Sequence, residues 1–589
     1  MSCIIYGLLG FWYTQPMSKL YQVSRLLTKK ERENLIQYDH LMSHLLFHRG
    51  IRKVEEAHAF LNPNYEEQSH DPFLLKDAEK AAARIIEAIR KGQKIAVYAD
   101  YDADGIPGAG IWHSFFTKIG YKNFIVYIPH RHDEGFGLNI DAIEQLVAEK
   151  VELIITVDCG ITDVIPSAKA RELGVDLIIT DHHEPKEILP IAFAIIDHKQ
   201  VDCNYPDKNI CGSGVAYKLI QAILKIDRLG LPVGYEKWFL DLVGIATLSD
   251  MVPLVGENRL FAHYGLMVLR KSPRKGLMQL LRKLKINQRY LNEDDIGYMI
   301  TPRINAASRM GLPMDAFYLL TADTDVDADK YSEHLDKINN ERKGVVASLV
   351  KEAKKHLHDR YGSDIPKVIV LGNPDWRPSL LGLVANTCAQ EFGRPAFFWG
   401  RDGSNIIKGS CRSEGETNVV ELMQNSSLQT FIQFGGHKYS GGFAVSNEEI
   451  HFLEKRLNEA SDKLNIKRKT EENFVDAEIA LDEVGGNLFN DINKLAPFGV
   501  GNPKPSFIFR NIKPILIKKF GKSNDHVEFV FKKNNEDKVS AISFFGEKEK
   551  WMDKVKVGEG VDLVASIEKS MFRGRPEIRL RVIDVTFPK

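Results

Sequence analysis

Three aspartates stand at every second position directly after an apolar run in residues 94–105, KIAVYADYDADG. They are Asp100, Asp102 and Asp104. A short buried strand that ends in a polar turn is how α/β proteins present reactive groups at the carboxyl edge of a parallel sheet. Carboxylates this close repel one another, and burying them is costly unless cations neutralise them. The spacing therefore indicates a divalent-cation site. The competing interpretation is an aspartate-rich surface turn, for which Asp-Gly is a common signal.

Three further apolar segments are each followed or punctuated by Asp or His. They are 151–160 with Asp158, 175–185 with Asp181, His182 and His183, and 239–254 with Asp250. A mixed set of carboxylates and imidazoles suits Mn²⁺ or Mg²⁺ better than a thiolate-type zinc site does. Cys159 has no CxxC partner, so we interpret it as a small buried residue.

Composition limits the classes of protein to which the chain can belong. Its 589 residues are 44% hydrophobic, which suits three or four globular units. The formal net charge is zero, so any nucleic-acid surface must be local. The scattered cysteines have neither zinc-finger nor disulfide spacing, and no apolar run is long enough to span a bilayer, so we expect a soluble protein of the cytoplasm. Met1 and Met17 both stay open as the start, with residues 1–16 as an upstream extension.

The pattern of strands and helices that must position these residues predicts an α/β fold with a doubly wound parallel sheet. Strands and helices alternate from 94 to about 255, as in a doubly wound parallel sheet. After residue 507 the chain becomes short alternating strands, as in a small β-barrel. The expected parts are an N-terminal extension and helical segment (1–90), the doubly wound domain (91–325), a connecting helix (326–360), a second, smaller α/β domain (361–465) and the barrel (466–589).

The predicted barrel has the composition of a surface for single-stranded nucleic acid. Residues 511–589 hold 17 Lys and Arg against 12 Asp and Glu, although the whole chain is neutral. Aromatic residues lie between these charges: Phe520, Phe544, Phe545 and Phe572. Stacking and charge together could hold a single strand.

From about residue 20 onward, the motifs resemble the RecJ-type single-strand-specific DNA exonucleases of the DHH phosphoesterase superfamily. The matching stretches are VYADYDADG, IPHRHDEGFGLN, VDCG, DHHEP, CGSGVAYKL, LSDMVPLVGENR, TPRINAASRMG, NNERK, KGSCRS, GGHKYSGGFAV and PFGVGNPKPSF. The resemblance implies a DHH catalytic domain, a DHH-associated substrate-binding domain and an OB-like nucleic-acid-binding domain. Three sites depart from the family: Tyr98 replaces a histidine found in pyrophosphatase relatives, DHKQ (197–200) replaces an Asn-Pro turn, and DWRPS (375–379) replaces Trp-His-Pro-Gly.

Phosphodiester hydrolysis needs a nucleophilic water, neutralised phosphoryl oxygens and a stabilised leaving oxygen, and a pair of metal ions supplies all three. Asp158 is the natural bridging carboxylate, because its strand is expected between the other two. The resemblance implies the other roles: Asp102 on one metal; Asp104, His182 and Asp250 on the other; His183 at the scissile phosphate; Asp181 orienting the histidines; and Asp100 orienting a ligand or holding a weak metal site.

Further residues are predicted to bind the substrate. Arg131, Arg303 and Arg309 could each offer a forked pair of donors to phosphate oxygens. The paired glycines around His437 would allow a nest of backbone N–H groups that faces an anion. The other predicted contacts are Asn305, Ser410, Arg412 and Ser413. For Trp376, stacking on a base and packing in the core both stay open.

These features together predict a Mn²⁺- or Mg²⁺-dependent exonuclease specific for single-stranded DNA. Its 5′→3′ polarity, release of mononucleotides, monomeric state and role in repair and recombination are implied by the resemblance alone, as are a single-strand-binding protein and a RecQ-like helicase as partners. One alternative is a phosphodiesterase for oligoribonucleotides or cyclic dinucleotides, against which the extra barrel argues. Another is a non-catalytic scaffold with a decayed site, against which the retained ligand residues argue.

Overall fold

The computed structural model describes residues 21–588 except 402, 404–405, 416, 428, 466–472, 522, 550 and 572–575. The predicted upstream extension and Phe572 therefore lie outside the described residues. The chain forms two compact units. One, called here the catalytic unit, comprises 63–469 and 497–502; the other, the terminal unit, comprises the described residues of 1–62, 470–496 and 503–589.

A parallel five-stranded sheet organises the first half of the catalytic unit, as predicted. Its strands are β2 (Ile95–Ala99), β3 (Phe124–Tyr127), β4 (Leu153–Val157), β5 (Asp176–Thr180) and β6 (Ala194–Ile196). The order is β3-β2-β4-β5-β6, and every neighbouring pair is parallel. The strand before Asp158 thus lies between the strands before Asp100 and Asp181, as expected from the sequence.

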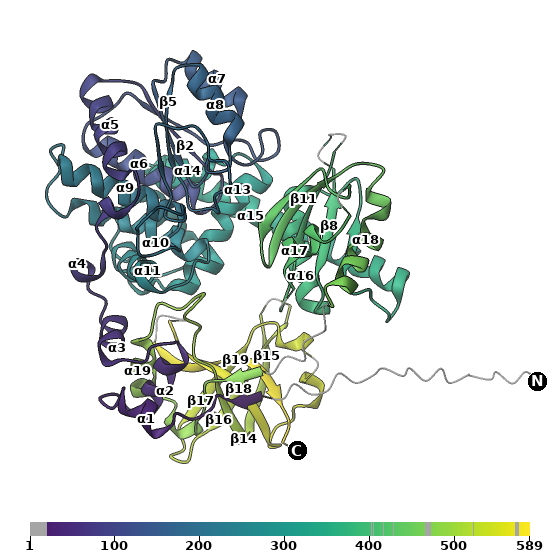
Figure 1. Ribbon diagram of the computed structural model, residues 1–589. Coiled ribbons are helices and arrows are strands. Elements are labelled where there is room, and N and C mark those ends of the chain that lie inside the picture. The colour runs from purple at the N-terminus through teal and green to yellow at the C-terminus, as the bar shows by residue number, and fades with distance from the viewer. Residues whose placement is uncertain are drawn as a thin grey trace, which may run out of the picture. The chain divides into compact units, whose positions relative to one another are not determined.

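Helices cover both faces of this sheet (Figure 1). On one face lie α5 (Ala78–Lys91), α6 (Gly105–Lys118) and α9 (Gly212–Ile226), and on the other lie α7 (Ile140–Ala148) and α8 (Val164–Glu172). Side chains of β2 alternate between two cores, with Val97 in one and Tyr98 in the other. Because both faces are buried, the strands are continuous apolar runs.

Helices then dominate as far as residue 361, in agreement with the sequence. They are α10 (Leu240–Ser249), α11 (Gly256–Leu269), α12 (Lys275–Lys283), a π-helical turn (Asp295–Ile300), α13 (Thr301–Met310), α14 (Met314–Thr321) and α15 (Asp325–Tyr361). The predicted connecting helix is α15, a 37-residue helix whose N-terminus is capped by the Thr324 side chain.

A second sheet follows in the catalytic unit, with order β10-β11-β9-β8-β7. Its elements are β7 (Ile369–Gly372), α16 (Pro378–Phe392), β8 (Ala396–Gly400), β9 (Ile407–Arg412), α17 (Val419–Gln424), β10 (Gln433–His437), β11 (Ser440–Val445) and α18 (Ile450–Lys463). The glycine pairs around His437 face each other across the β10–β11 hairpin, where the sequence suggested a nest. Trp376 is buried and packs on Phe398, so it belongs to the core.

The terminal unit is built on a seven-stranded sheet of order β13-β14-β18-β19-β17-β16-β15. Its strands are β13 (Ala477–Glu478), β14 (Phe507–Ile512), β15 (Pro514–Phe520), β16 (His526–Lys532), β17 (Lys538–Ser543), β18 (Val561–Ser570) and β19 (Glu577–Thr586). Strands β15 to β19 agree with the short alternating strands expected after residue 507. Only Lys513 separates β14 from β15 in the sequence, although β14 pairs with β18 and β15 pairs with β16.

The N-terminal segment packs within this same terminal unit. It contains β1 (Tyr21–Val23), α1 (Lys29–Glu33), α2 (His40–His48) and α3 (Val54–Leu61), whereas α4 (Tyr65–Gln68) belongs to the catalytic unit. The sequence indicated helices alone here. Strand β1 exists because it pairs in parallel with β12 (Asn473–Val475), and His44 Nε2 lies 2.7 Å from the Asp476 carbonyl oxygen.

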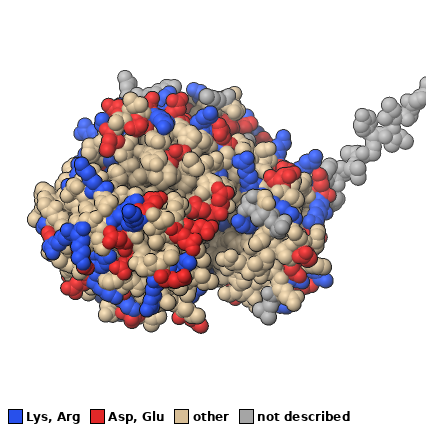
Figure 2. Space-filling view, turned by 90° about the horizontal axis from the view of Figure 1, so that it is seen from above, with Lys and Arg blue, Asp and Glu red and all other residues tan. Residues whose placement is uncertain are grey.

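Charged side chains of both signs are interspersed on the face drawn in Figure 2. This agrees with equal totals of 79 basic and 79 acidic residues. None of the helices in the described part of the chain combines the length and the apolar composition that crossing a bilayer requires.

Candidate metal and phosphate site

The aspartates that end the strands meet at the carboxyl edge of the parallel sheet. Backbone pairing continues one residue beyond each strand: the N–H groups of Asp100, Asp158 and Asp181 donate to the carbonyls of Val157, Thr180 and Ile196. The loops therefore leave the sheet in register. This explains how side chains from three strands reach one small volume.

Seven side chains form three overlapping groups, in each of which the possible ligand atoms lie within 4.8 Å of one another. The groups are Asp104, His182 and Asp250; Asp100, Asp102 and Asp158; and Asp158, His182 and His183. Every residue predicted from the sequence to bind metal is present. Asp158 and His182 each belong to two of the groups, and of these two only Asp158 has the pair of oxygens with which a carboxylate can contact two metal ions.

His182 lies at the centre of this cluster. Its Nε2 is 3.0 Å from Asp158 Oδ1, 3.7 Å from Asp250 Oδ2 and 3.8 Å from Asp104 Oδ2. Burial and the neighbouring charge of His183 hold the pKa of His182 well below its usual range. A neutral imidazole among carboxylates is the form that binds a metal ion.

The carboxylates are held in a high-energy arrangement. Burial, and next the charges of neighbouring aspartates, raise the pKa values of Asp100 and Asp158 well above 3.8, and burial together with Asp102 raises the pKa of Asp104 to about 6. Among the described residues, Asp100 Oδ1 and Asp158 Oδ1 are buried without a hydrogen-bond partner. Asp158 also has φ +63°, which is rare for a non-glycine residue. The carboxylates repel one another, and in the described part of the chain two of their oxygens lack hydrogen-bond donors. A divalent cation that prefers oxygen ligands would relieve both effects.

Asp104 is fixed by the first residues of α9. Its Oδ2 accepts the Gly212 N–H at 2.6 Å, and its Oδ1 accepts the Ser213 N–H at 2.8 Å. A Cβ at Gly212 would lie 2.6 Å from the Asp158 Cβ, so only glycine allows this approach. The sequence analysis quoted these residues within CGSGVAYKL but gave them no role.

Asp181 orients the adjacent histidines. Its Oδ1 accepts from His183 Nδ1 and from the His182 N–H, both at 2.7 Å, and its Oδ2 accepts the Ile161 N–H at 2.9 Å. Burial opposes the charges of this pair. Burial is the largest single effect, but the hydrogen bond and the attraction between the opposite charges together outweigh it, so the pKa of Asp181 falls to about 2 and that of His183 rises to about 9. This raised pKa favours the protonated form of His183, which belongs to the group with Asp158 and His182.

Three arginines from distant parts of the sequence lie near one another. Burial, followed by the charges of Arg131 and Arg412, lowers the pKa of Arg309 to about 9. The Arg309 Nη1 donates to the Ser379 carbonyl at 2.8 Å, and the Arg131 guanidinium lies 4.7 Å from the Tyr101 ring centre. Within the described residues none of the three pairs with a carboxylate. Gathered guanidinium groups of this kind favour an anion such as phosphate.

The other predicted substrate contacts divide into two sets. Asn305 Oδ1 accepts the Ala103 N–H at 3.0 Å, inside the aspartate loop. Arg303 instead donates to Asp336 on α15 and to the Met299 carbonyl, so the structure does not bring it to the cluster.

The second sheet of the catalytic unit places the remaining predicted contacts. The His437 ring stacks 6.4 Å from the His183 ring. Ser410 and Arg412 lie on β9, two residues apart, and the Ser413 N–H donates to the Tyr439 carbonyl.

Phe136 is a rim residue that the sequence analysis did not single out. Its ring centre lies 5.5 Å from that of His183 and 6.5 Å from that of Tyr101, and its side chain is 49% exposed. An exposed aromatic ring beside the candidate phosphate-binding histidine could stack on a base. The sequence could have indicated this residue, because Phe136 is a large apolar residue between two glycines in the polar motif HRHDEGFGL.

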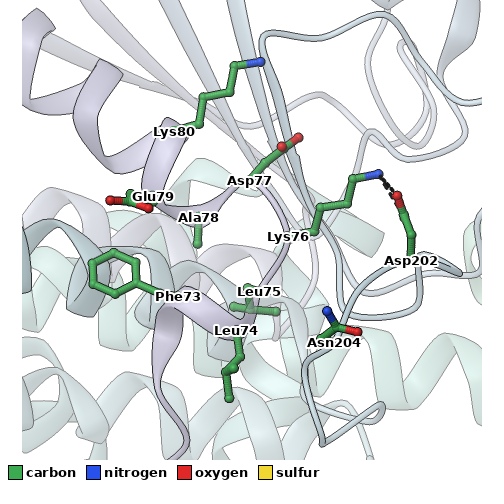
Figure 3. A pocket seen from close by; sticks show the side chains of 10 residues that line it. All are labelled: Phe73, Leu74, Leu75, Lys76, Asp77, Ala78, Glu79, Lys80, Asp202 and Asn204. Carbon is green, nitrogen blue, oxygen red and sulfur yellow. Dashed lines mark hydrogen bonds and ion pairs between the residues drawn. The ribbon is translucent and has the colours of Figure 1, made fainter.

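A separate pocket of about 390 Å³ lies by the start of α5. Figure 3 shows Lys76 paired with Asp202 in it, and Nζ lies 2.7 Å from the carboxylate. None of its lining residues belongs to the carboxylate–histidine cluster. The groups that could do chemistry are therefore at the sheet edge, away from this pocket.

Comparison with known families gives three domain matches. The DHH family N-terminal domain matches residues 94–247, the DHHA1 domain matches 366–466, and the RecJ OB domain matches 475–584. The first spans the strands that carry the aspartates, and the second spans Ser410, Arg412 and His437.

Curated relatives and a solved structure extend the match over nearly the whole chain. The single-stranded-DNA-specific exonuclease RecJ of Bacillus subtilis is 34% identical over 92% of this chain and 67% of its own length. That of Haemophilus influenzae is 28% identical over 93% and 96%. The crystal structure of RecJ in complex with Mn²⁺ from Thermus thermophilus has a TM-score of 0.79 and 26% identity, covering 97% of this chain and 80% of that one. With all three domains in the same order, the chain belongs to the RecJ family.

Proposed function

We propose that this protein is a metal-dependent exonuclease that hydrolyses single-stranded DNA from an end. The observation that carries the proposal is the buried Asp158 carboxylate, which is shared by two groups of possible metal ligands. The names of its relatives point to the same activity. Buried carboxylates that repel one another destabilise the fold. An enzyme needs them to bind metal ions, whereas a non-catalytic scaffold does not.

The family resemblance and the ligand groups support one division of the metal residues. Asp104, His182 and Asp250, which form one group, would hold one Mn²⁺ or Mg²⁺, and Asp102 would hold the other. Asp158, which is grouped with His182 and also with Asp102 and Asp100, would contribute to both. Bound metal would neutralise phosphoryl oxygens and lower the pKa of a water. The backbone donors from Gly212 and Ser213 would orient Asp104 and favour its ionised form, which is the form that binds a metal ion.

The cationic side chains would bind the phosphates of the strand. His183, protonated and held by Asp181, is placed to donate to the scissile phosphate. Arg131, Arg309 and Arg412 would hold a neighbouring phosphate, with His437, Ser410 and Ser413 beside them. Asn305 would act indirectly by holding the Ala103 N–H in the metal loop. We assign Arg303 to joining α13 and α15, because its donors are already used there.

The terminal unit would hold the single-stranded tail. Phe520, Phe544 and Phe545 surround His526, with ring centres between 4.9 and 5.3 Å from that of His526. The Arg581 guanidinium lies 4.1 Å from the Phe544 ring centre. We call these four rings the aromatic cluster. Exposed rings beside an arginine suit base stacking without sequence preference.

Several finer points belong to the same proposal. They are 5′→3′ polarity, release of mononucleotides, a role in repair and recombination, a single-strand-binding protein and a RecQ-like helicase as partners, a monomeric state, a cytoplasmic location, and the domain boundaries 90/91, 325/326, 360/361 and 465/466. The family resemblance supports the activity and its partners. The five described cysteines, all unpaired, support a reducing compartment.

Digestion of an end-labelled single-stranded oligonucleotide with Mn²⁺ tests the proposal, beside its duplex form and an Asp158→Ala protein. We expect a 5′ label to be released at once as mononucleotide, the duplex to be spared and the variant to be inactive. Survival of the long strand with cleavage of dinucleotides would instead identify a small-substrate phosphodiesterase. Binding without cleavage would identify a scaffold.

A further inference from the structure

Asp250 has less support in the metal cluster than Asp104 has. The side chain is 25% exposed, compared with 1% for Asp104 and 3% for Asp158. Two backbone N–H groups donate to the Asp104 carboxylate, but among the described residues no hydrogen bond is donated to the carboxylate of Asp250. Helix α10 (Leu240–Ser249) fixes the backbone on one side of Asp250, whose N–H donates to the Ala246 carbonyl at 2.9 Å, so the remaining support must come from the backbone that follows it.

That backbone is the loop between α10 and α11, residues 250–255. Its second residue, Met251, has φ +60°, an unfavourable conformation for a side chain of this kind. The loop needs outside contacts to stay in this shape. One comes from α11, where Asn258 Nδ2 donates to the Pro253 carbonyl at 3.1 Å.

The other contact comes from a turn nearly 250 residues away in the sequence. Residues 497–502, PFGVGN, belong to the catalytic unit, although the chain before and after them belongs to the terminal unit. The Val500 carbonyl accepts the Leu254 N–H at 2.7 Å. Arg259, buried near the start of α11, places Nη1 3.5 Å from the Pro497 carbonyl.

Hydrogen bonds within the turn hold its shape. Gly499 and Asn502 exchange backbone hydrogen bonds of 2.9 and 3.1 Å, and the buried Asn502 side chain donates to the Pro497 carbonyl at 2.8 Å. Gly501 has φ +75°, and a Cβ there would lie 3.2 Å from the Pro253 Cβ. Glycine is therefore required both by the backbone and by the close approach to the loop.

We propose that the turn 497–502 is a positioning element of the metal site, which holds Asp250 in place through Pro253 and Leu254. This inference rests on the proposed function, because it assigns Asp250 to a metal ion. It gives the motif PFGVGNPKPSF a role at an aspartate that lies nearly 250 residues earlier in the sequence. The turn touches no reacting group itself.

A pair of matched glycine variants tests this role. Gly501→Ala strains a backbone of φ +75° and presses on Pro253, whereas Gly174→Ala strains one of φ +76° with nothing within 4 Å of the new Cβ. Both should lower the Tm to a similar degree. Mn²⁺ affinity, measured by titration calorimetry without DNA, should fall about tenfold in Gly501→Ala only, the scale expected when a support of a metal ligand is lost. Excess Mn²⁺ should restore its kcat.

Equal Mn²⁺ affinity in the two folded variants would overturn the proposal, because the turn would then be packing alone. If Gly501→Ala does not fold, Asn502→Asp replaces it: this nearly isosteric change removes the donor to Pro497 and should also weaken Mn²⁺ binding. A folded Asn502→Asp protein with unchanged affinity would equally overturn the role. Failure of the wild-type protein to bind Mn²⁺ or to cut DNA would remove the proposed function itself, which is a separate outcome.

Discussion

The metal cluster of the catalytic unit and the aromatic cluster of the terminal unit are built on opposite principles. The first gathers like charges in a buried place, where burial and mutual repulsion raise the pKa values of Asp100 and Asp158. The second gathers rings at the surface, where Phe545 is 59% exposed. In the metal cluster, repulsion between carboxylates destabilises the fold until a cation binds. In the aromatic cluster, a bound strand would cover exposed apolar surface.

This difference predicts how each region responds to substitution. A buried, over-determined site loses its chemistry when one member changes, although the fold gains stability. An exposed group of interchangeable rings loses affinity gradually, because each ring stacks on one base. The two regions can therefore be told apart by effect size and by the sign of the stability change.

The largest expected effect is that of Asp158→Asn on hydrolysis. The amide keeps the shape of the side chain but removes the charge shared by two ligand groups. We expect kcat to fall by about 10³-fold or more, because loss of metal charge stabilisation is worth several kcal/mol. Single-turnover digestion at saturating Mn²⁺ measures this. A fall below tenfold would contradict the bridging placement.

Asp181→Asn should have a smaller effect, because Asp181 acts through His183. Without the carboxylate the His183 ring loses its 2.7 Å partner and the cause of its raised pKa. We expect kcat/KM to fall about 10- to 100-fold, the range for residues that orient a functional group. The measurement is kcat/KM against pH in both proteins. Since the histidine pKa falls in the variant, its activity should decline at a lower pH than that of the wild type.

The sequence revealed the metal cluster because its signal is local. Each aspartate follows directly after an apolar strand, and parallel strands bring their carboxyl ends to one edge. The supports of the cluster carry no such signal. Gly212, Ser213 and the turn 497–502 lie more than 100 residues away in the sequence from the aspartates they support, so no pattern near Asp104 or Asp250 predicts them.

The arginines of α13 show what could still have been learned from spacing. Asn305 and Arg309 are four residues apart and share a helix face, whereas Arg303 lies two residues before Asn305 on the opposite side. The structure accordingly places Asn305 at the metal loop and Arg303 against Asp336. Helical periodicity within TPRINAASRMG would have separated the two. The proximity of Arg412 to Arg131 and Arg309 depends on the second sheet, which no such pattern specifies.

The direction in which Asp158→Asn changes the stability of the metal-free protein also separates the two regions. Folding raises the pKa of Asp158, because burial disfavours its charged form. The folded protein is therefore more stable at low pH, where Asp158 is protonated, and loses this stability as pH rises. In EDTA, Asp158→Asn should therefore be more stable than the wild type at pH 8. The difference should shrink as pH falls, because a larger share of the Asp158 carboxyl is then protonated in the wild type. Thermal unfolding at pH 8 and at lower pH measures it, and a less stable variant at pH 8 would contradict the account.

The smallest expected effect is that of Phe545→Gly in the aromatic cluster. Phe545 has φ +61°, which glycine adopts without strain, so the change removes the ring while relaxing the backbone. The Tm should not fall, but KM for a long single strand should rise about fivefold, since one stacked base is worth about 1 kcal/mol or more. Val557→Gly removes an exposed side chain outside the cluster and is the control. Cleavage of a trinucleotide should be unchanged in both variants. If the long strand and the trinucleotide respond alike, the rings do not hold the tail, and the terminal unit contributes to the enzyme in another way.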